Sequence, residues 1–423
     1  MTQTYCIHVI GGGLYGCLTA WQIKRLNPSF KVVLLEAADH LMSAFDSISI
    51  DGVELNNGFH GIEIPRAEAL LNFFQNELSV DFIKTSNERL LSIGGELLPA
   101  DAPLAEYPTI LKKNFKTMGG FQSDVASDFW SVISPEYMET LKKIGHRYSD
   151  HIENYEQLLI PWFFPADYVL NSSDEGEKFR NQVKSHEIKA GYGIPAKSIF
   201  SVLQPAIKKC LEACGVEIRL SVKVDFKKDN FRYTDSDGGD TVSLLEADKV
   251  FYCASSALIL RTAAPEIFSQ LSLEKRYLAN ALMQYEDGSL TRPFSEILCC
   301  DLRIPELARI SQPTSFCTND QSNENLIQAE LFFLNKEEYT DCADLITQGV
   351  ARVLNPIANG DLKIRGLKVT RQVYFPARQD LLQANSFISI WASQFKNFHY
   401  RNIYGPINMS KAWLWSLQDA ELV

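Results

Sequence analysis

The sequence lacks the features that mark nucleic-acid-binding and membrane proteins. Its 423 residues include 41 basic and 52 acidic side chains, a formal net charge of −11, and no basic block is present. This balance argues against non-specific binding to nucleic acid and to anionic membranes. No run approaches the ~18 apolar residues that a membrane-spanning helix needs. We therefore expect a soluble protein with a small-molecule substrate, no nucleic acid and no membrane span, and the sequence predicts no oligomeric state.

Sequence marks of several enzyme classes are missing as well. The nine cysteines show no C-x-x-C spacing, and their odd number favours reduced thiols in a cytoplasmic protein over a disulfide framework. None of the seven histidines forms H-x-x-x-H or H-E-x-x-H, so we predict no metal site. No G-x-S-x-G occurs either, which argues against a hydrolase.

What the sequence does contain is a glycine cluster of the form G-x-G-x-x-G at residues 11–16. Residues 5–10 before it are mostly β-forming, and residues 14–26 after it carry apolar or small side chains at helical spacing. Residues 31–36 form a second apolar stretch that ends in an acid. This order of strand, glycine turn, helix, strand and acid is the context that a dinucleotide-binding βαβ unit requires.

Each position in this unit has a physical task. Gly11 permits a tight turn, Gly13 lets a pyrophosphate approach the backbone, and Gly16 lets the helix lie close to the strand. Free N–H groups at the helix N-terminus favour the negative charge of the pyrophosphate. Glu36 is placed to accept hydrogen bonds from the adenosine ribose. The predicted cofactor-binding positions in this unit are Gly11, Gly12, Gly13, Leu14, Tyr15, Gly16, Glu36 and Ala37.

The stretch that follows predicts a hairpin around Asp51-Gly52 and then a turn at residues 57–60. With this turn, the chain resembles the flavin-binding superfamily of amine oxidases, protoporphyrinogen oxidases and UDP-galactopyranose mutases. The resemblance implies that the cofactor is FAD and that residues 57–60 lie beside the isoalloxazine ring. The mutases carry a Gly-x-His here, which Gly58-Phe59-His60 matches. The resemblance covers roughly residues 1–65, 190–260 and 370–423.

The chain departs from the superfamily at Met42-Ser43-Ala44, where a Gly-Gly-Arg is usual. A pair of glycines there lets the backbone crowd the cofactor, so the replacement bears on how tightly and in what pose a flavin is held. Two interpretations of Ser43 stay open. Its hydroxyl supplies a hydrogen bond to a phosphate or ribityl oxygen, or it is an ordinary loop serine.

The middle of the chain follows the order of the superfamily's second cofactor segment. We predict a helix over residues 198–213 that ends at Gly215, a strand from Val216 to Val224, and a strand ending at Ala254. The resemblance implies that Val224 gives backbone hydrogen bonds to the adenine and that Ala254 passes close to the ADP. Residues 191–193, a Gly-Tyr-Gly soon followed by a proline, are no second dinucleotide motif, which argues against a separate NADPH site.

The end of the chain resembles the superfamily's last cofactor segment, in which the final strand ends at a glycine and a helix N-terminus points at the flavin. Gly405 matches that glycine, and Asn408 or Ser410 replaces the acid that usually follows. An aromatic-proline element before this segment ends at Arg378. This residue is a candidate to bind an anionic substrate group, although single arginines are more often structural.

The resemblance implies an α/β fold in which a Rossmann-like FAD-binding domain is intertwined with a substrate domain of mixed sheet and helices. We place the FAD-binding domain at residues 1–65, 190–265 and 390–423, and the substrate domain at residues 66–189 and 266–389. The aromatic residues between positions 130 and 165 predict either core packing between the domains or an apolar substrate pocket. Other predicted elements are strands at residues 295–301, 325–333 and 363–374 and a helix at residues 343–354.

Three functions fit these residues. The first is an FAD-dependent oxidoreductase that takes a hydride from a C–N, C–C or C–O bond of a small organic substrate. The second is a sugar-nucleotide mutase without net redox change, which Gly58-Phe59-His60 favours. The third is a protein that holds FAD for structure only, motivated by Met42-Ser43-Ala44. His60 either orients the substrate or moves a proton near neutral pH, or it shapes the turn.

Overall fold

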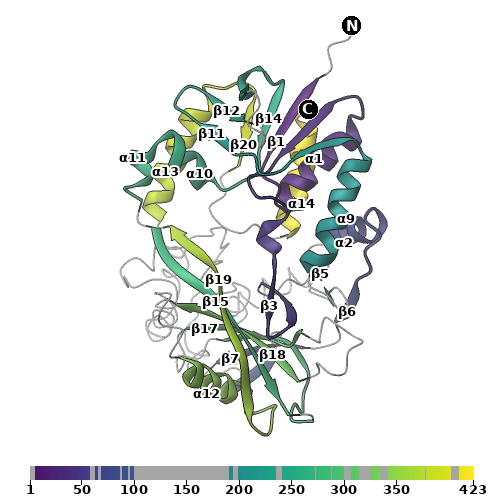
Figure 1. The fold of residues 1–423 in the computed structure, drawn as a ribbon, viewed down its shortest axis with the longest axis vertical. Coiled ribbons are helices and arrows are strands. Elements are labelled where there is room, and N and C mark those ends of the chain that lie inside the picture. Colours follow the sequence, from purple (N-terminus) through teal and green to yellow (C-terminus); the bar gives the residue numbers. More distant parts are fainter. Residues whose placement is uncertain are drawn as a thin grey trace, which may run out of the picture.

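The computed structural model describes the chain in segments. These are residues 5–57, 62–64, 68–85, 88–93, 96–99, 190–193, 199–234, 241–271, 273–286, 288–299, 306–313, 325–333, 342–376, 378–401 and 409–423. They form an α/β fold with one parallel sheet and separate antiparallel and mixed sheets, which confirms the predicted class. Two sheets dominate, and a hairpin lies between them (Figure 1). No helix in these segments has the length and apolar character needed to cross a membrane.

The first large sheet has five parallel strands in the order β10-β2-β1-β14-β20. Strands β1 and β2, in the middle of the sheet, are buried on both faces, as expected for a parallel sheet covered on both sides. Their neighbours come from distant parts of the sequence, so the predicted βαβ unit is the start of a larger doubly covered sheet. The strands are β1 (Cys6–Ile10), β2 (Lys31–Leu35), β10 (Val216–Arg219), β14 (Lys249–Tyr252) and β20 (Phe398–Tyr400).

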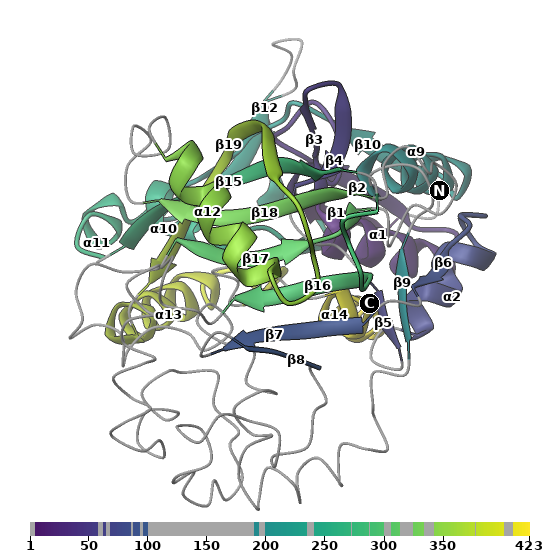
Figure 2. The same ribbon diagram turned by 90° about the horizontal axis from the view of Figure 1, so that it is seen from below.

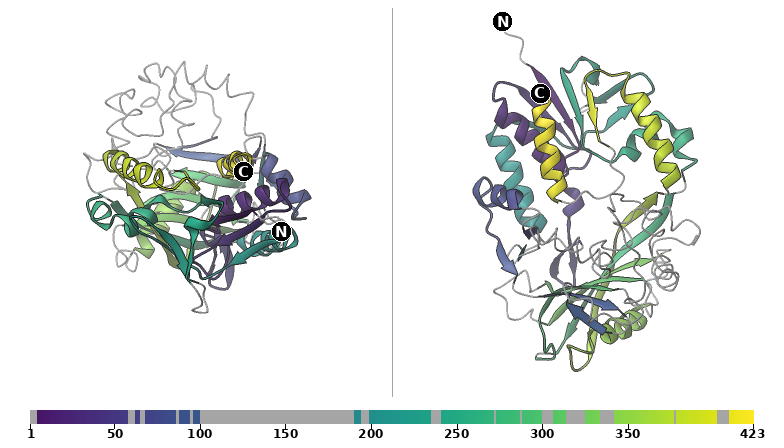
Figure 3. Two further views of the ribbon diagram at one scale, coloured as in Figure 1. Left: turned by 90° about the horizontal axis from the view of Figure 1, so that it is seen from above. Right: turned by 180° about the vertical axis from the view of Figure 1, so that it is seen from behind.

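Helices cover one face of this sheet. Ile7 and Val9 of β1 belong to a core shared with α1 (Leu14–Leu26), α9 (Ile199–Ala213) and α14 (Met409–Glu421). Figure 3 shows α14 beside α1, and these two helices are in extensive contact. The predicted helix boundaries at residues 14–26 and 198–213 are confirmed to within one residue, with Gly215 at a φ of 81° just after α9.

The other face of the parallel sheet packs against a small antiparallel sheet and more helices. Ile10 of β1 shares an aromatic core there with Phe226, Phe231 and Trp391. The elements are β11 (Val224–Phe226), β12 (Phe231–Thr234), β13 (Thr241–Ser243), η5 (Leu244–Glu246), α10 (Ser256–Ala263), α11 (Pro265–Phe268) and α13 (Arg378–Ala392).

The second large sheet has seven strands in the order β19-β15-β18-β17-β16-β7-β8 and is antiparallel except between β16 and β7. Helix α12 (Ala343–Leu354) lies across one face, as Figure 2 shows, and packs against Ala279, Ala281 and Ile327. The strands are β7 (Glu88–Ile93), β8 (Glu96–Pro99), β15 (Leu273–Tyr285), β16 (Phe294–Cys299), β17 (Leu307–Ser311), β18 (Leu326–Phe333) and β19 (Leu362–Pro376).

The hairpin of β3 (Ser47–Ile50) and β4 (Val53–Asn56) connects the two large sheets. Asp51 and Gly52 form its two-residue loop with φ values of 50° and 76°, the turn predicted from the sequence. Its apolar side chains pack on the seven-stranded sheet at Leu282 and Leu326. The remaining described elements are η1 (Ser43–Phe45), β5 (Ile62–Ile64), α2 (Glu68–Asn76), β6 (Ile83–Thr85) and β9 (Ala190–Gly193).

The prediction of one strand from Val216 to Val224 is wrong. Strand β10 stops at Arg219, where its pairing with β2 ends, and β11 begins at Val224 in a different sheet. Between them Ser221 adopts a φ of 57°, which redirects the chain. The sequence also did not indicate β15 or α13. The aromatic residues between positions 130 and 165 lie outside the described residues, and the domain boundaries stay a prediction.

Candidate dinucleotide-binding site

The glycine turn connects β1 to α1. The atoms around Gly11 and Gly16 leave no space for a side chain at either position. Gly11 has a φ of 106°, and a Cβ there would come within 3.0 Å of the Ala254 Cβ. A Cβ on Gly16 would lie 1.8 Å from the Gly11 carbonyl oxygen. Both glycines are therefore required by the fold itself. Gly16 was predicted to let the helix lie close to the strand, and a side chain there would collide with the turn.

Gly13 differs from its neighbours because the space beside it is open. A Cβ built there would meet no atom of the described residues within 4 Å, and its φ of −67° is one that any residue adopts. Gly13 caps α1 without a side-chain hydrogen bond, and the first turn of the helix holds no acid. The open space thus faces a helix N-terminus whose first N–H groups have no partners within the helix. The partial positive charge of this helix N-terminus suits a pyrophosphate.

Glu36 reaches from the end of β2 back to this turn. Its carboxylate accepts hydrogen bonds from the N–H of Gly12, at 2.5 Å, and from the N–H of Ala38, at 2.7 Å. Ala37 lies between the acid and Ala38 in the same loop. Gly12 is also confined, because a Cβ there would come within 2.7 Å of Leu41 and 2.9 Å of the Glu36 Cβ. The ribose acid and the phosphate turn therefore form one connected unit.

The loop after Glu36 contacts the turn through Met42. The Met42 N–H donates to the Gly12 carbonyl oxygen at 2.8 Å, and the Met42 side chain is fully buried. Its φ of 60° and ψ of 30° lie in the left-handed region that glycine favours. The replacement of the superfamily's glycine thus keeps a glycine-like backbone here. Ser43 follows at the start of η1 and is exposed.

His40 stabilises the same loop. Its ring is hydrogen-bonded to Asp39 through Nδ1 at 2.5 Å and to Asp46 through Nε2 at 2.8 Å. Burial lowers the pKa of His40, but the two carboxylates outweigh burial and the pKa is raised overall. His40 therefore links the start of the loop to its end.

Ala254 and Val224, the other residues predicted to contact the adenosine half of the cofactor, lie in different places: Ala254 is beside the glycine turn, and Val224 is in a separate sheet. Ala254 follows β14 and lies against Gly11. Val224 is buried in β11, where it pairs with Tyr233. The main chain of Glu36 is bonded on both sides, because its N–H donates to the Arg219 carbonyl oxygen and its carbonyl oxygen accepts from the Val222 N–H, each at 2.9 Å. Val222 is not among the predicted positions, because the turn at Ser221 has no glycine to indicate it.

Tyr15 serves the helix packing behind the turn. Its hydroxyl donates to the buried carboxylate of Asp419 on α14, and Arg401 donates to the same carboxylate at 2.7 Å. Burial raises the pKa of Tyr15, with the Cys253 thiol and Asp419 adding to the shift. These bonds hold α14 and the residue after β20 against α1.

Several predicted site residues lie outside the described residues, namely Gly58, His60, Gly405 and Asn408. Strand β20 ends at Tyr400, before the segment that contains Gly405 and Asn408. Arg378 begins α13. Within the described part of the chain no group of three or more histidine, cysteine or acidic side chains is arranged to hold a metal ion.

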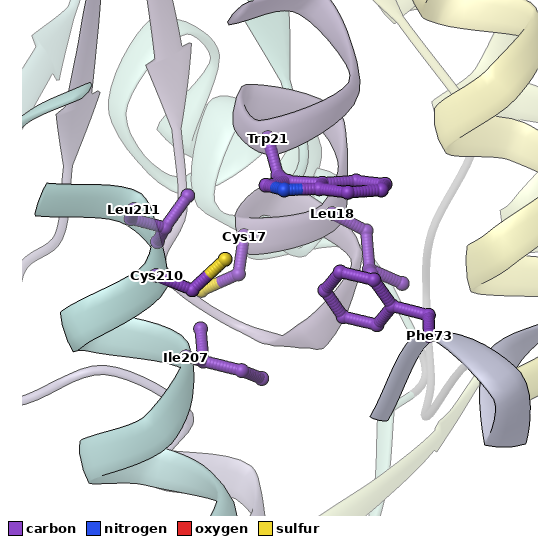
Figure 4. A pocket seen from close by; sticks show the side chains of 7 residues that line it. All are labelled: Cys17, Leu18, Trp21, Phe73, Ile207, Cys210 and Leu211. Atoms are coloured by element: carbon purple, nitrogen blue, oxygen red, sulfur yellow. The ribbon is translucent and has the colours of Figure 1, made fainter. Parts of the chain in front are cut away.

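A shallow crevice, too narrow to hold a water molecule, lies between α1, α2 and α9 (Figure 4). Its lining is apolar apart from two thiols. Burial raises the pKa of both Cys17 and Cys210, the latter to about 11, so neither thiol is an activated nucleophile. The crevice is lined by Cys17, Leu18, Trp21, Phe73, Ile207, Cys210 and Leu211.

The fold and the glycine turn define a protein with a dinucleotide-binding Rossmann-like domain. Residues 9–76 match the family model of the NAD(P)-binding Rossmann-like domain. No curated protein sequence matches the chain.

Solved structures share the fold over the whole chain. A putative protoporphyrinogen oxidase from Exiguobacterium sp. 255-15 is 13% identical, with a TM-score of 0.66, and the match covers 100% of this chain and 99% of that one. A reduced UDP-galactopyranose mutase is 13% identical, with a TM-score of 0.67 and coverage of 99% and 95%. A putrescine oxidase bound to putrescine is 14% identical, with a TM-score of 0.61 and coverage of 99% and 98%. The predicted resemblance in fold is confirmed.

Proposed function

We propose that this protein is an FAD-dependent oxidoreductase that acts on a small organic substrate. The observation that carries the proposal is the open space at Gly13, at the N-terminus of α1, with the Glu36 carboxylate bonded into the same turn. The fold shared over full length with a protoporphyrinogen oxidase and a putrescine oxidase supports the choice of chemistry. A bound flavin would supply hydride acceptance, which no amino-acid side chain provides.

The chain's own residues would bind and orient the cofactor and the substrate. We assign the pyrophosphate to the N–H groups around Gly13 and the ribose hydroxyls to Glu36. His60 would orient the substrate or move a proton, and Arg378 would bind an anionic group of it. The remaining contacts that we assign to the cofactor are Gly11, Gly12, Leu14, Tyr15, Gly16, Ala37, Ser43, Gly58, Val224, Ala254, Gly405 and Asn408.

An absorbance spectrum of the purified protein tests this proposal. We expect a yellow protein that releases one FAD per chain on denaturation, identified by chromatography. Anaerobic screening of small amines, alcohols and cyclic substrates should then find a compound that bleaches the flavin. Release of NAD, or a folded protein that takes up no nucleotide, would contradict the proposal.

A sugar-nucleotide mutase is the second candidate. Gly58-Phe59-His60 favours it, and so does the fold shared with a UDP-galactopyranose mutase at a TM-score of 0.67. A mutase would be active only with reduced flavin and would leave the flavin reduced after turnover. If FAD is bound but neither test gives turnover, the third candidate, a structural flavin, is favoured.

A further inference from the structure

Two cysteines lie one helical turn apart at the C-terminal end of α9. The Cys214 N–H donates to the Cys210 carbonyl oxygen at 3.0 Å, so the helical spacing continues to Cys214, one residue beyond the end of α9 at Ala213. Residues four apart share one face of a helix, and helical side chains lean toward the N-terminus of the helix. The Cys214 side chain therefore lies over Cys210, and a hydrogen bond joins the two thiols.

The two thiols differ in their exposure to solvent. Cys214 is exposed, whereas Cys210 is half-buried and lines the crevice between α1, α2 and α9 (Figure 4). No other cysteine in the described segments is exposed. An oxidant in solution therefore meets Cys214 first and finds a second thiol directly behind it. An accessible thiol next to a resolving thiol is the arrangement of reversible cysteine oxidation sites.

The spacing of the two residues suits a disulfide. A rise of about 1.5 Å per residue puts the Cα atoms of residues four apart in a helix about 6 Å from each other. Disulfide-bonded cysteines have Cα atoms roughly 4.4–6.8 Å apart. The bond also requires the two Cβ atoms to approach each other. The backbone at Cys214 has the freedom for this approach, because Cys214 lies beyond α9 and Gly215 follows it at a φ of 81°.

Cys17 also lines the crevice, but its thiol is engaged elsewhere. It is buried and donates to the Gly12 carbonyl oxygen at 3.3 Å. Burial raises the pKa of Cys17 and of Cys210, the latter to about 11, so neither thiol loses its proton readily enough to react first with an oxidant. Cys210 is therefore suited to act second, on an oxidised Cys214.

We propose that Cys210 and Cys214 form a reversible oxidation site for hydroperoxides. The Cys214 sulfur attacks one oxygen of hydrogen peroxide, the O–O bond breaks, and one water leaves with the Cys214 proton, so that Cys214 becomes a sulfenic acid. The Cys210 sulfur then attacks the Cys214 sulfur, the S–O bond breaks, and a second water leaves with the Cys210 proton. Two thiols are oxidised to one disulfide, and one peroxide is reduced to two waters. A dithiol such as dithiothreitol restores both thiols by exchange.

Trp21 of α1 is placed to report the oxidation. Its indole N–H, which can only donate, is hydrogen-bonded to the Cys210 thiol. The centroid of its ring lies 4.4 Å from that of Phe73, which lines the same crevice. Closing the disulfide turns the Cys210 sulfur toward Cys214 and away from the indole. Oxidation should therefore change the tryptophan fluorescence of the protein, and Trp21→Phe should remove most of that change.

Peptide mapping tests the proposal on the protein as purified. The reduced protein is treated with hydrogen peroxide, its remaining thiols are alkylated, and the chain is cut with trypsin. Cleavage after Lys209 and Arg219 releases one peptide that holds both cysteines. We expect this peptide to carry no alkyl group and to be lighter by two hydrogen atoms than its reduced form, and dithiothreitol to reverse both changes. Two alkylated cysteines, an alkylated Cys210 beside an oxidised Cys214, or a disulfide to Cys17 would overturn the proposal.

Serine variants separate the roles of the two thiols. Cys210→Ser should leave a sulfenic acid on Cys214, which dimedone traps, and Cys214→Ser should leave Cys210 reduced and the fluorescence unchanged by peroxide. Cys342→Ser is the matched control, because Cys342 is also half-buried, at the N-cap of α12, and this variant should behave as the wild type. Equal loss of the Cys210 thiol in Cys214→Ser and in the wild type would overturn the proposal.

This oxidation site does not depend on the proposed function. A protein that takes up no FAD would contradict the proposed function, but the peptide of residues 210–219 would still be expected to close its disulfide. A protein that binds FAD and leaves both thiols reduced after peroxide treatment would overturn the oxidation site alone.

Discussion

The carboxylate of Glu36 accepts a hydrogen bond from the main-chain N–H of Gly12 at 2.5 Å, across the end of the parallel sheet. The residue proposed to bind the ribose thus also holds the turn proposed to bind the pyrophosphate. A second bond from Ala38 fixes the carboxylate from the other side. Changes at Glu36 should therefore affect the binding of both the ribose and the pyrophosphate.

Replacing Glu36 by alanine should weaken FAD binding by roughly ten- to hundredfold, because charge-assisted hydrogen bonds are worth about 1.5–3 kcal/mol. The nucleotide-free variant should also have a lower melting temperature than the wild type, because the N–H groups of Gly12 and Ala38 lose their acceptor. Titration of the apoprotein with FAD measures the first effect and thermal unfolding the second. Glu212→Ala, at an exposed position of α9, is the control. An unchanged dissociation constant for Glu36→Ala would mean that the carboxylate does not face the ribose.

Gly13→Ala should affect FAD binding, whereas Gly16→Ala should affect folding. Gly13→Ala should leave the free energy of unfolding of the nucleotide-free protein within about 0.5 kcal/mol of wild type, because the added Cβ meets no atom of the described residues within 4 Å. It should nevertheless abolish or strongly weaken FAD binding, because the methyl group occupies the pyrophosphate's space. Gly16→Ala should fail to fold stably, since its Cβ would lie 1.8 Å from the Gly11 oxygen. Normal FAD binding by Gly13→Ala would place the nucleotide elsewhere.

Met42→Gly should be more stable than Met42→Ala by about 1 kcal/mol. Both variants lose the packing of a buried side chain, but only alanine retains the penalty of the left-handed backbone. Ala206→Gly, inside α9, should show the ordinary opposite order, with glycine less stable by about 1 kcal/mol. Urea unfolding of the three variants and the wild type measures the differences. A Met42→Ala protein as stable as Met42→Gly would show that residue 42 does not keep this conformation.

The stability of the protein should fall as the pH drops from about 6.5 to about 4 because of His8. Burial lowers the pKa of His8 to about 4, with Arg219 and Lys31 adding to burial and Glu217 opposing it. The folded protein keeps the ring neutral while the unfolded chain takes up a proton, which costs at most about 3 kcal/mol. His8→Phe should remove this slope in urea unfolding series.

His40 should change the free energy of unfolding with pH in the direction opposite to that of His8. Because its pKa is raised in the folded protein, its contribution is present at low pH and is lost as the pH rises through the raised value. His40→Gln should therefore cost stability mainly on the acid side. If the free energy of unfolding of His8→Phe depended on pH as steeply as that of the wild type, the role of His8 would be contradicted.

His60→Ala should leave FAD bound and the melting temperature unchanged. If the imidazole is a general acid or base, the rate of flavin reduction by substrate should fall by roughly 10²–10⁴. Cofactor content, melting temperature and reduction rate are measured on the same sample. Loss of both FAD and stability would instead make His60 a structural residue of the turn.

Local patterns in the sequence determined the dinucleotide unit. The glycines at 11 and 16 fix a turn by backbone conformation and close approach, Gly13 leaves space beside it, and the helix of residues 14–26 follows from apolar spacing along a few turns. The Asp51-Gly52 hairpin follows from positive φ angles that the two residues tolerate. Each feature is decided by residues close together in the chain, so a sequence pattern is sufficient to predict it.

Tertiary pairing alone decided the second sheet and the bonds of the buried amides Asn57, Asn280 and Gln328. Strand β15 contains Ala279, Asn280 and Ala281, which have little preference for strands, and it becomes extended because β18 and β19 pair along its two sides. Asn280 is 223 residues from its partner Asn57, and Gln328 is 272 residues from Asn56. A buried amide is stable only where another chain segment supplies its hydrogen bonds, and no periodicity near Asn57 indicates which segment that is.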